Sequence, residues 1–462
     1  MNALIYTSAL GIICLLAEIF NLRKLIIPIA IAGLLAILGT VALDWNADNS
    51  IREAALYNML RADSFSLTFS GLLISLTVLL LMLSTDFYKT EQAKISDYIA
   101  LILFILAGSL AMASFGNLAM LFLGIEVLSI SLYIMAGANK HDKRSNEAGM
   151  KYFLMGSFAS GLLLFGIALV YGETGSFDIV EIRDFIATHQ PTSMLYVGVG
   201  LMLMALLFKT GAAPFHYWAP DVYEGAPMFH TAILMTVAKI GAFAAFYRLF
   251  SACFIPVMMP FGWVLSIVVA LTITVGNLSA LVQDSFKRML ALSGVSNAGY
   301  LMIAIVTLYG KTDNAVFYYS LAYGMALITA FTIAILVYRS SETESFSGFN
   351  GLAKRHPFIA ASLTIAMLSL AGIPPFAGFF GKYYIFSEAV RNGRMWLVII
   401  ATINSIIGVY YYLKVVFAMY LKESDSNAAP LQIPVIYSVV IAITLTVILA
   451  VGLFPSTVLG WL

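Results

Sequence analysis

The chain has 462 residues, of which 61% are hydrophobic and only 11% are charged. A soluble protein carries about 25% charged residues, and so few charges cannot cover the surface of a globule of this size. The composition therefore excludes a soluble globular protein, a disordered chain and a nucleic-acid-binding protein. The net charge of +1 also indicates no polyanionic partner. These observations predict an integral membrane protein that is surrounded by a lipid bilayer.

Apolar runs separated by short charged or Gly/Pro-rich connections predict about fourteen membrane-spanning helices. Helices are expected because an open sheet edge cannot satisfy its backbone groups in hydrocarbon. We therefore expect an all-α polytopic membrane protein whose residues 1–462 form a single membrane domain. The expected helices cover residues 2–20, 25–43, 64–84, 97–114, 117–137, 150–171, 194–219, 228–250, 261–280, 288–308, 315–338, 357–387, 395–420 and 434–457.

The basic residues of the connections predict the orientation, because cytoplasmic connections carry an excess of Lys and Arg. Fourteen helices place both termini on the same side, and we expect that side to be the outer, periplasmic face of the plasma (inner) membrane. The cytoplasmic side then holds fifteen basic residues, Arg23, Lys24, Lys89, Lys94, Lys140, Lys143, Arg144, Lys151, Lys287, Arg288, Arg339, Lys354, Arg355, Lys414 and Lys422. The outer side holds seven, Arg52, Arg61, Arg183, Arg248, Lys311, Arg391 and Arg394.

Three lysines have no connection to lie in, because Lys209, Lys239 and Lys382 fall within predicted spans, as does Glu126. A charged side chain at the bilayer centre costs about 2.5–3.5 kcal/mol on insertion scales. These four residues should therefore face the interior of the helix bundle. The alternative is that they reach the interface from a helix end or form ion pairs that only fix helix packing.

Buried lysines suit proton transfer, because desolvation makes the ammonium group give up its proton more readily and a nearby carboxylate reverses that effect. Arginine stays protonated everywhere in proteins and cannot serve in this way. The sequence thus predicts a proton or cation path through Glu126 and the three lysines. His216 and His230 flank a short connection and could join such a relay or be ordinary interface histidines.

Two predicted helices are broken close to a lysine. Pro214 follows Lys209, and Pro374 and Pro375 precede Lys382, with Gly residues beside each break. Freed carbonyl groups at membrane depth are tolerated only inside protein or beside water. The breaks lie 160 residues apart, from Pro214 to Pro374, which indicates two repeats. Each repeat would hold five helices, an odd number, so the repeats must be inverted. We expect a three-helix start (1–96), repeats at 97–250 and 261–420, and a last helix at 434–457.

Metal and cofactor sites are not expected on this chain. Cys14 and Cys253 each stand alone in an apolar run, so they cannot form a cluster of thiolate ligands. The sequence also lacks a nucleotide-binding fingerprint and a paired-histidine haem site.

Three stretches carry a resemblance to a known family. They are FKTGAAPFHYWAPDVYEGAPMFHTAILMTVAKIGAFAAFYRLF (208–250), VGNLSALVQDSFKRMLALSGVSNAGYLM (275–302) and LAGIPPFAGFFGKYYIF (370–386). The chain resembles the antiporter-like membrane subunits of respiratory complex I. It departs from that pattern at Asn297, where relatives commonly have a histidine, and this departure argues against a histidine relay at that point.

The resemblance implies fourteen helices with two inverted five-helix repeats, helices 4–8 and 9–13, and broken helices 7 and 12. By motif, Glu126 matches the helix-5 glutamate and Lys209 its helix-7 partner. Lys239 matches the central lysine of helix 8, and Lys382 the helix-12 lysine of the outer half-channel. The implied function is proton translocation coupled to remote quinone reduction in an NADH:quinone oxidoreductase. The implied partners are the other membrane subunits, including antiporter-like neighbours, while FMN, iron–sulfur clusters and quinone would lie in partner subunits.

Other functions remain open from the sequence. A multi-subunit cation/proton antiporter or a membrane-bound hydrogenase could use the same fold and lysines. A solute transporter would need a second polar cluster, which the sequence does not show. A purely structural subunit would tolerate replacement of the lysines without loss of turnover.

Overall fold

The structure is a computed structural model that describes the chain except for residues 1, 46–57, 89–94, 309–311, 424–430 and 460–462. Every secondary-structure element in the described ranges is a helix, and the only β-type pairings there are three isolated bridges. The all-α prediction is therefore confirmed. Four of the basic residues used to predict the orientation, Arg52, Lys89, Lys94 and Lys311, lie outside the described residues.

Thirteen helices in the described ranges are long and apolar enough to cross a membrane. The fourteenth expected span is divided by a break into α16 (Pro357–Ala371) and α17 (Ala377–Arg391), neither of which is long enough alone. The thirteen are α1 (Asn2–Ile19), α2 (Arg23–Trp45), α3 (Ser64–Phe87), α4 (Ile95–Ser114), α5 (Leu118–Ala136), α6 (Lys143–Thr174), α8 (Ser193–Thr210), the continuous segment Met228–Ala252, α12 (Met258–Leu281), α13 (Phe286–Val306), α14 (Asp313–Ser341), α18 (Met395–Leu421) and α19 (Val435–Leu453).

Shorter helices connect or interrupt these spans. The segment Met228–Ala252 consists of α10 (Met228–Ile233), a π-helical turn (Leu234–Ala238) and α11 (Lys239–Ala252). The remaining α-helices are α7 (Ile179–Thr188), α9 (Trp218–Gly225) and α15 (Leu352–Arg355), and three 3₁₀ turns cover Ile255–Val257, Phe346–Phe349 and Pro455–Thr457.

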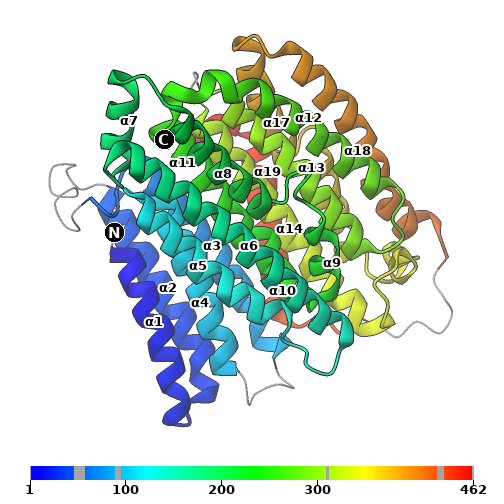
Figure 1. The fold of residues 1–462 in the computed structure, drawn as a ribbon. Helices are drawn as coiled ribbons and strands as arrows, with labels where there is room; N and C mark the ends of the chain where they lie inside the picture. The colour runs from blue at the N-terminus through cyan, green and yellow to red at the C-terminus, as the bar shows by residue number, and fades with distance from the viewer. Residues whose placement is uncertain (1, 46–57, 89–94, 309–311, 424–430, 460–462) are drawn as a thin grey trace.

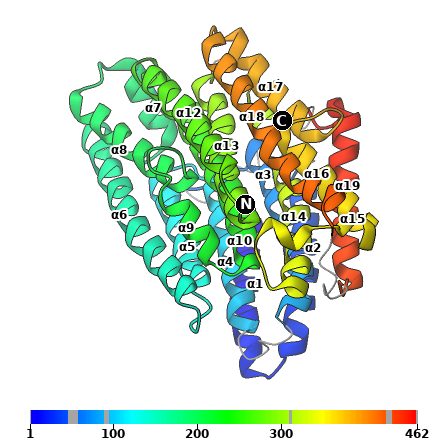
Figure 2. The same cartoon turned by 90° about the vertical axis from the view of Figure 1, so that its right-hand side faces the viewer.

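Burial separates central helices from peripheral ones. The apolar cores of α13, α14 and Met228–Ala252 are buried throughout by the rest of the chain, whereas only about a third of the residues in the apolar cores of α1, α2, α6 and α18 are buried. Figure 2 shows the same order, with α6 and α8 on one side, α19 on the other, and α10, α13 and α14 between them. In Figure 1, α1 and α2 lie side by side at one edge of the bundle. A lysine on α11 is therefore at the centre of the protein.

The two predicted breaks share one backbone geometry. Helix α8 ends at Thr210 because Gly211 adopts a left-handed φ of +72°, and α16 ends at Ala371 because Gly372 adopts φ +82°. Glycine is favoured at such helix ends since it has no Cβ to clash. In both cases the glycine N–H and the next N–H bond to carbonyls of the last turn. The two glycines lie 161 residues apart.

The breaks confirm the prediction that these two helices are interrupted, and they correct the predicted boundaries. The expected helix 194–219 stops at Thr210, and the expected helix 357–387 divides at Ala371 and resumes at Ala377. In each case the chain leaves the helix several residues before the first proline, because the glycine cap ends it.

A buried arginine joins α11 to the start of α3. The Arg248 side chain is 4% exposed, and its guanidinium donates to the Asp63 carboxylate at 2.8 and 3.0 Å and to the Phe115 carbonyl at 2.9 Å. Asp63 also caps α3, because it accepts from the Ser66 N–H at 2.8 Å. Sequence analysis placed Arg248 among the outer connections, whereas its partners are provided by two helix ends that pack on α11.

Acid should weaken this junction. Partial burial alone would raise the pKa of Asp63, but the Arg248 guanidinium and the Ser66 N–H outweigh it and lower that pKa below its usual value. Its contribution to stability is therefore complete above the pKa of the unfolded chain, about 3.9, and is lost as the pH falls through the lowered value. We expect Asp63→Asn to lower the free energy of unfolding at neutral pH by about 1.5 kcal/mol, the lower end for a charged hydrogen bond, because the carboxylate is half exposed.

Thermal unfolding of the detergent-purified chain between pH 3 and 7 measures this effect. Asp184→Asn is the matched control, because Asp184 forms an exposed pair with Arg183 and such pairs contribute little. Equal unfolding temperatures for both variants at every pH would contradict the assignment.

Candidate ion-translocation site

Lys239 lies in the centre of the bundle, directly after the π-helical turn. Its side chain is 4% exposed, and Nζ donates to the Gly294 carbonyl on α13 at 2.6 Å. A Cβ at position 294 would lie 3.3 Å from Nζ and 3.4 Å from the Tyr323 hydroxyl, so the missing side chain leaves room for both polar groups. Neither the ion pairs nor the hydrogen bonds of the described residues give Lys239 a carboxylate partner.

Polar side chains continue from this point along α13. Asn297 lies one turn after Ser293, donates to the Ser293 carbonyl at 2.7 Å and to the Tyr412 hydroxyl at 3.3 Å, and accepts from the Tyr319 hydroxyl at 2.5 Å. All of these groups are buried. Asn297 therefore joins α13, α14 and α18.

A second set of buried groups extends the polar region to the other broken helix. The ring of Tyr411 lies 4.5 Å from that of Tyr412, and its hydroxyl donates to Asn277 at 2.9 Å. Asn277 in turn donates to the Tyr300 hydroxyl at 3.2 Å. The Lys382 ammonium lies 4.7 Å from the centre of the Tyr300 ring. Polar and aromatic contacts thus lead from Asn297 to Lys382, and Lys239 binds the same helix, α13, one turn before Asn297.

The break between α16 and α17 supplies the principal partner of Lys382. Its Nζ donates to the Ala371 carbonyl at 2.9 Å and to the Ser405 hydroxyl at 3.0 Å. Ala371 is the last residue of α16, so its carbonyl has no helical donor. A cavity of about 590 Å³ lies beside the lysine and is partly lined by Ser405 and Arg391. The sequence placed Lys382 close to a helix break, and the structure gives the reason: the break frees the carbonyl that binds the lysine.

Lys209 and Glu126 occupy the side of the bundle formed by α5, α6 and α8. The Lys209 ammonium donates to the Ser129 hydroxyl and lies 5.9 and 5.7 Å from the rings of Tyr133 and Tyr152. The Glu126 carboxylate accepts from the Ser160 hydroxyl. Both charged residues are partly exposed at the surface of the chain. They are neighbours, but within the described residues serine hydroxyls are their hydrogen-bond partners and no direct ion pair joins them.

The sequence provided only a weak signal for Ser129 and Ser160. Ser129 lies one helical turn after Glu126, which places it on the same helix face, but serines are common in membrane helices.

The first break also differs from the second, because its Phe208 carbonyl accepts the Trp218 indole N–H at 3.0 Å and no lysine.

The two histidines are buried and lie on either side of α9. Both ring nitrogens of His230 have partners, the Met135 carbonyl at 2.8 Å and the Tyr88 hydroxyl at 2.7 Å. A carbonyl can only accept, so Nδ1 carries the proton and Nε2 accepts from Tyr88. His216 stacks on Tyr217 with ring centres 4.6 Å apart. Within the described residues, neither His216 nor His230 forms a hydrogen bond with Lys209, Lys239 or Lys382.

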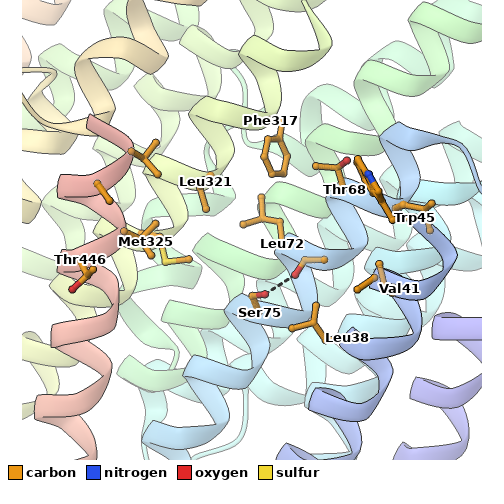
Figure 3. Close-up of a pocket in the computed structure, with 16 residues that line it drawn as sticks. Leu38, Val41, Trp45, Thr68, Leu72, Ser75, Phe317, Leu321, Met325 and Thr446 are labelled. Carbon is orange, nitrogen blue, oxygen red and sulfur yellow. Dashed lines mark hydrogen bonds between the residues drawn. The ribbon is translucent and has the colours of Figure 1, made fainter. Parts of the chain in front are cut away.

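The described residues hold no group of three or more His, Cys, Asp or Glu side chains that could bind a metal. Cys14 and Cys253 are buried and unpaired. A cavity of about 730 Å³ between α2, α3, α14 and α19 lies away from the lysines (Figure 3). It is mainly apolar, and the hydroxyls of Thr68, Ser75 and Thr446 donate to carbonyls of their own helices. The candidate functional groups therefore lie near Lys209, Lys239 and Lys382 and not in this cavity.

Comparison with known proteins agrees with this geometry. Residues 115–408 match the family model described as "NADH:quinone oxidoreductase/Mrp antiporter, TM". The chain is 47% identical over 460 residues to NADH-quinone oxidoreductase subunit N of Flavobacterium psychrophilum, with 99% of each chain covered. It is 43% identical over 462 residues to subunit N of Cytophaga hutchinsonii, again with 99% of each covered. These matches confirm the resemblance expected from the sequence.

Two solved structures share the fold of this chain. A chain of respiratory complex I from Thermus thermophilus superposes with a TM-score of 0.84 at 30% identity, covering 99% of this chain and 98% of that one. A chain of the Mrp complex from Dietzia sp. superposes with a TM-score of 0.83 at 22% identity, covering 98% and 96%. The latter likeness concerns the fold alone.

Proposed function

The chain belongs to the membrane family shared by NADH:quinone oxidoreductases and Mrp antiporters, and from this premise we propose that it translocates protons as an antiporter-like subunit of an NADH-quinone oxidoreductase. The observation that carries the proposal is the set of buried polar groups from Asn297 to Lys382, which begins on α13 one turn after the carbonyl that binds Lys239. A purely structural subunit has no need of such a series through its most enclosed helices.

In this proposal Lys209 and Lys239 take up protons from the cytoplasmic side, and Lys382 releases them at the outer side. The hydroxyl and amide groups near Asn297, together with water, carry the proton between Lys239 and Lys382. Asparagine does not titrate, so Asn297 orients Tyr319 and Tyr412 and does not hold the proton itself. Moving one proton against 100 mV costs about 2.3 kcal/mol, which the remote redox reaction must supply.

Glu126 and Lys209 provide the switch. Each is held by a serine hydroxyl on a different neighbouring element, so a small shift of α5 relative to α8 can bring the two charges together or separate them. Approach of the carboxylate stabilises the protonated lysine, and separation favours release of its proton. Both residues are partly exposed on the face where an adjacent membrane subunit can deliver such a signal.

The repeats, the orientation and the cofactors complete the proposal. Residues 97–250 and 261–420 form the two inverted repeats, supported by the matching glycine caps 161 residues apart. Both termini lie on the periplasmic side of the inner membrane. FMN, iron–sulfur clusters and quinone are bound by partner subunits, and antiporter-like subunits are among the membrane neighbours.

Replacement of the charged residues tests the proposal. We expect Lys239→Met and Glu126→Gln to reduce NADH-driven proton translocation in proteoliposomes at least tenfold while the complex still assembles. Lys239→Arg should be equally inactive, because arginine keeps a positive charge but does not release its proton. The measurement is quenching of a pH-sensitive dye, normalised to the amount of assembled complex.

Lys414→Met is the matched control, because Lys414 pairs with the exposed Asp284 near a helix end. Full pumping by the Lys239→Arg variant would contradict the proposed role of that lysine.

Two adjacent tyrosines test the path itself. Tyr319 and Tyr318 are both buried on α14, but the Tyr319 hydroxyl donates to Asn297 and the Tyr318 hydroxyl donates to the Val451 carbonyl at 2.8 Å. We expect Tyr319→Phe and Tyr318→Phe to cost similar stability, about 1 kcal/mol for one hydrogen bond. Only Tyr319→Phe should slow proton translocation several-fold in the same assay. Equal rates in the two variants would exclude the path through Asn297.

Thiol labelling tests the orientation. The native cysteines are buried, so an exposed cysteine introduced on α7, Ala187→Cys, or in the connection before α6, His141→Cys, provides the signal. We expect a membrane-impermeant maleimide to label Ala187→Cys in right-side-out cells and His141→Cys only in inverted vesicles. The reverse pattern would place the termini in the cytoplasm.

A further inference from the structure

A basic and aromatic cavity lies where α12 and α18 begin, away from Lys209, Lys239 and Glu126. The cavity has a volume of about 310 Å³ and is lined by Trp263, Val306, Asn392, Gly393, Arg394 and Trp396. Because α12 and α18 are spans and the cavity is at their first residues, it lies at the level of the lipid headgroups. Tryptophan is enriched at that level of a membrane.

The cation of this cavity has no anionic partner among the residues that the structure describes. The Arg394 guanidinium lies 5.0 Å from the centre of the Trp263 ring and is placed against Gly262. Within the described residues, the guanidinium nitrogen atoms of Arg394 form no ion pair and no hydrogen bond. The nearby acid, Glu388, is already paired with Arg391 at 2.7 Å. The cavity therefore carries one uncompensated positive charge.

A second donor in the same cavity is also without a partner. The Trp396 ring is parallel to the Trp263 ring, with centres 6.2 Å apart and an interplanar angle of 8°. Its indole Nε1 is buried and has no hydrogen-bond acceptor. Buried donors in proteins are almost always paired, so an acceptor from outside the chain is expected to satisfy it.

The start of α18 adds a third feature that favours an anion. Arg394 is the residue before the helix, and its carbonyl accepts from the N–H groups of Leu397 and Val398. The N–H groups of Met395 and Trp396 precede the first helical bond and are directed towards the helix start. Arg394 and Trp396 both line the cavity at this helix start, and a guanidinium, an indole N–H and a helix N-terminus are donors that bind a phosphate group.

We propose that this cavity binds the phosphate group of an anionic phospholipid, in the leaflet at the beginning of α12 and α18. The guanidinium and the Trp396 indole donate to the phosphate oxygens, and the lipid chains extend along the exposed apolar residues of α12, which include Val264, Ile267 and Leu271. A lipid is favoured over a soluble anion because the cavity opens among apolar side chains at the end of two spans.

Native mass spectrometry of the purified full chain in detergent, titrated with phosphatidylglycerol, tests this site. We expect Arg394→Gln to weaken binding of the tightest phosphatidylglycerol molecule by about tenfold or more, since a hydrogen bond to a charged group contributes about 1.5–3 kcal/mol. Trp396→Phe keeps the ring, removes the donor and should weaken binding several-fold. Arg394→Lys should retain part of the affinity and shows that the variants fold.

Arg391→Gln is the matched control, because it removes a positive charge three residues away on an exposed side chain that already has a partner. Unchanged phosphatidylglycerol affinity in Arg394→Gln would overturn the proposal. Displacement of the lipid by millimolar inorganic phosphate would assign the cavity to a free anion and would also overturn it. Loss of an adjacent subunit from the Arg394→Gln complex, with lipid binding unchanged, would identify a protein contact and would likewise contradict the lipid site.

Discussion

An ammonium group within a membrane-spanning bundle needs a hydrogen-bond acceptor, and this protein provides one for each of its three intramembrane lysines, of which Lys239 and Lys382 are buried and Lys209 is partly exposed. Lys239 binds the Gly294 carbonyl, Lys382 binds the carbonyl freed at the end of α16, and Lys209 binds a serine hydroxyl. All three acceptors are neutral. A neutral acceptor stabilises the ammonium less than a carboxylate does, which suits the proposed role of these lysines in proton transfer.

The helix breaks show how one backbone device serves two purposes. Each helix ends at a glycine in the left-handed conformation. The N–H groups of this glycine and of the next residue bond to carbonyls of the last turn, and the carbonyl of the last helical residue is left without a backbone donor. At α16 that carbonyl binds Lys382, whereas at α8 the neighbouring Phe208 carbonyl binds the Trp218 indole. The first break therefore fixes the packing of α9 against α8, and the second holds a cation. The two breaks share their backbone geometry and differ in their chemistry.

The sequence was sufficient for the architecture because hydropathy, charge and Gly/Pro positions depend on the chain alone. Fourteen spans, two breaks and the lysines within them follow from those patterns. The helix ends at Thr210 and Ala371 did not, since a glycine cap several residues before a proline ends the helix first. The polar series through Asn297, Tyr319 and Asn277 was also missed, because it depends on the rotation of α12, α13, α14 and α18 about their axes. The partners of Arg248, Asp63 and the Phe115 carbonyl, were missed for the same reason.

The π-helical turn before Lys239 has a consequence for the register of the whole span. Each residue of an α-helix turns the chain by about 100°, and a π turn accommodates one extra residue by widening the helix locally. The residues before the turn contact α5 and α3, through His230 and its partners, while those after it direct Lys239 towards α13. The wide turn thus changes the rotation of the helix surface about its axis, which lets one continuous span present two different faces to two sets of neighbours without an internal proline.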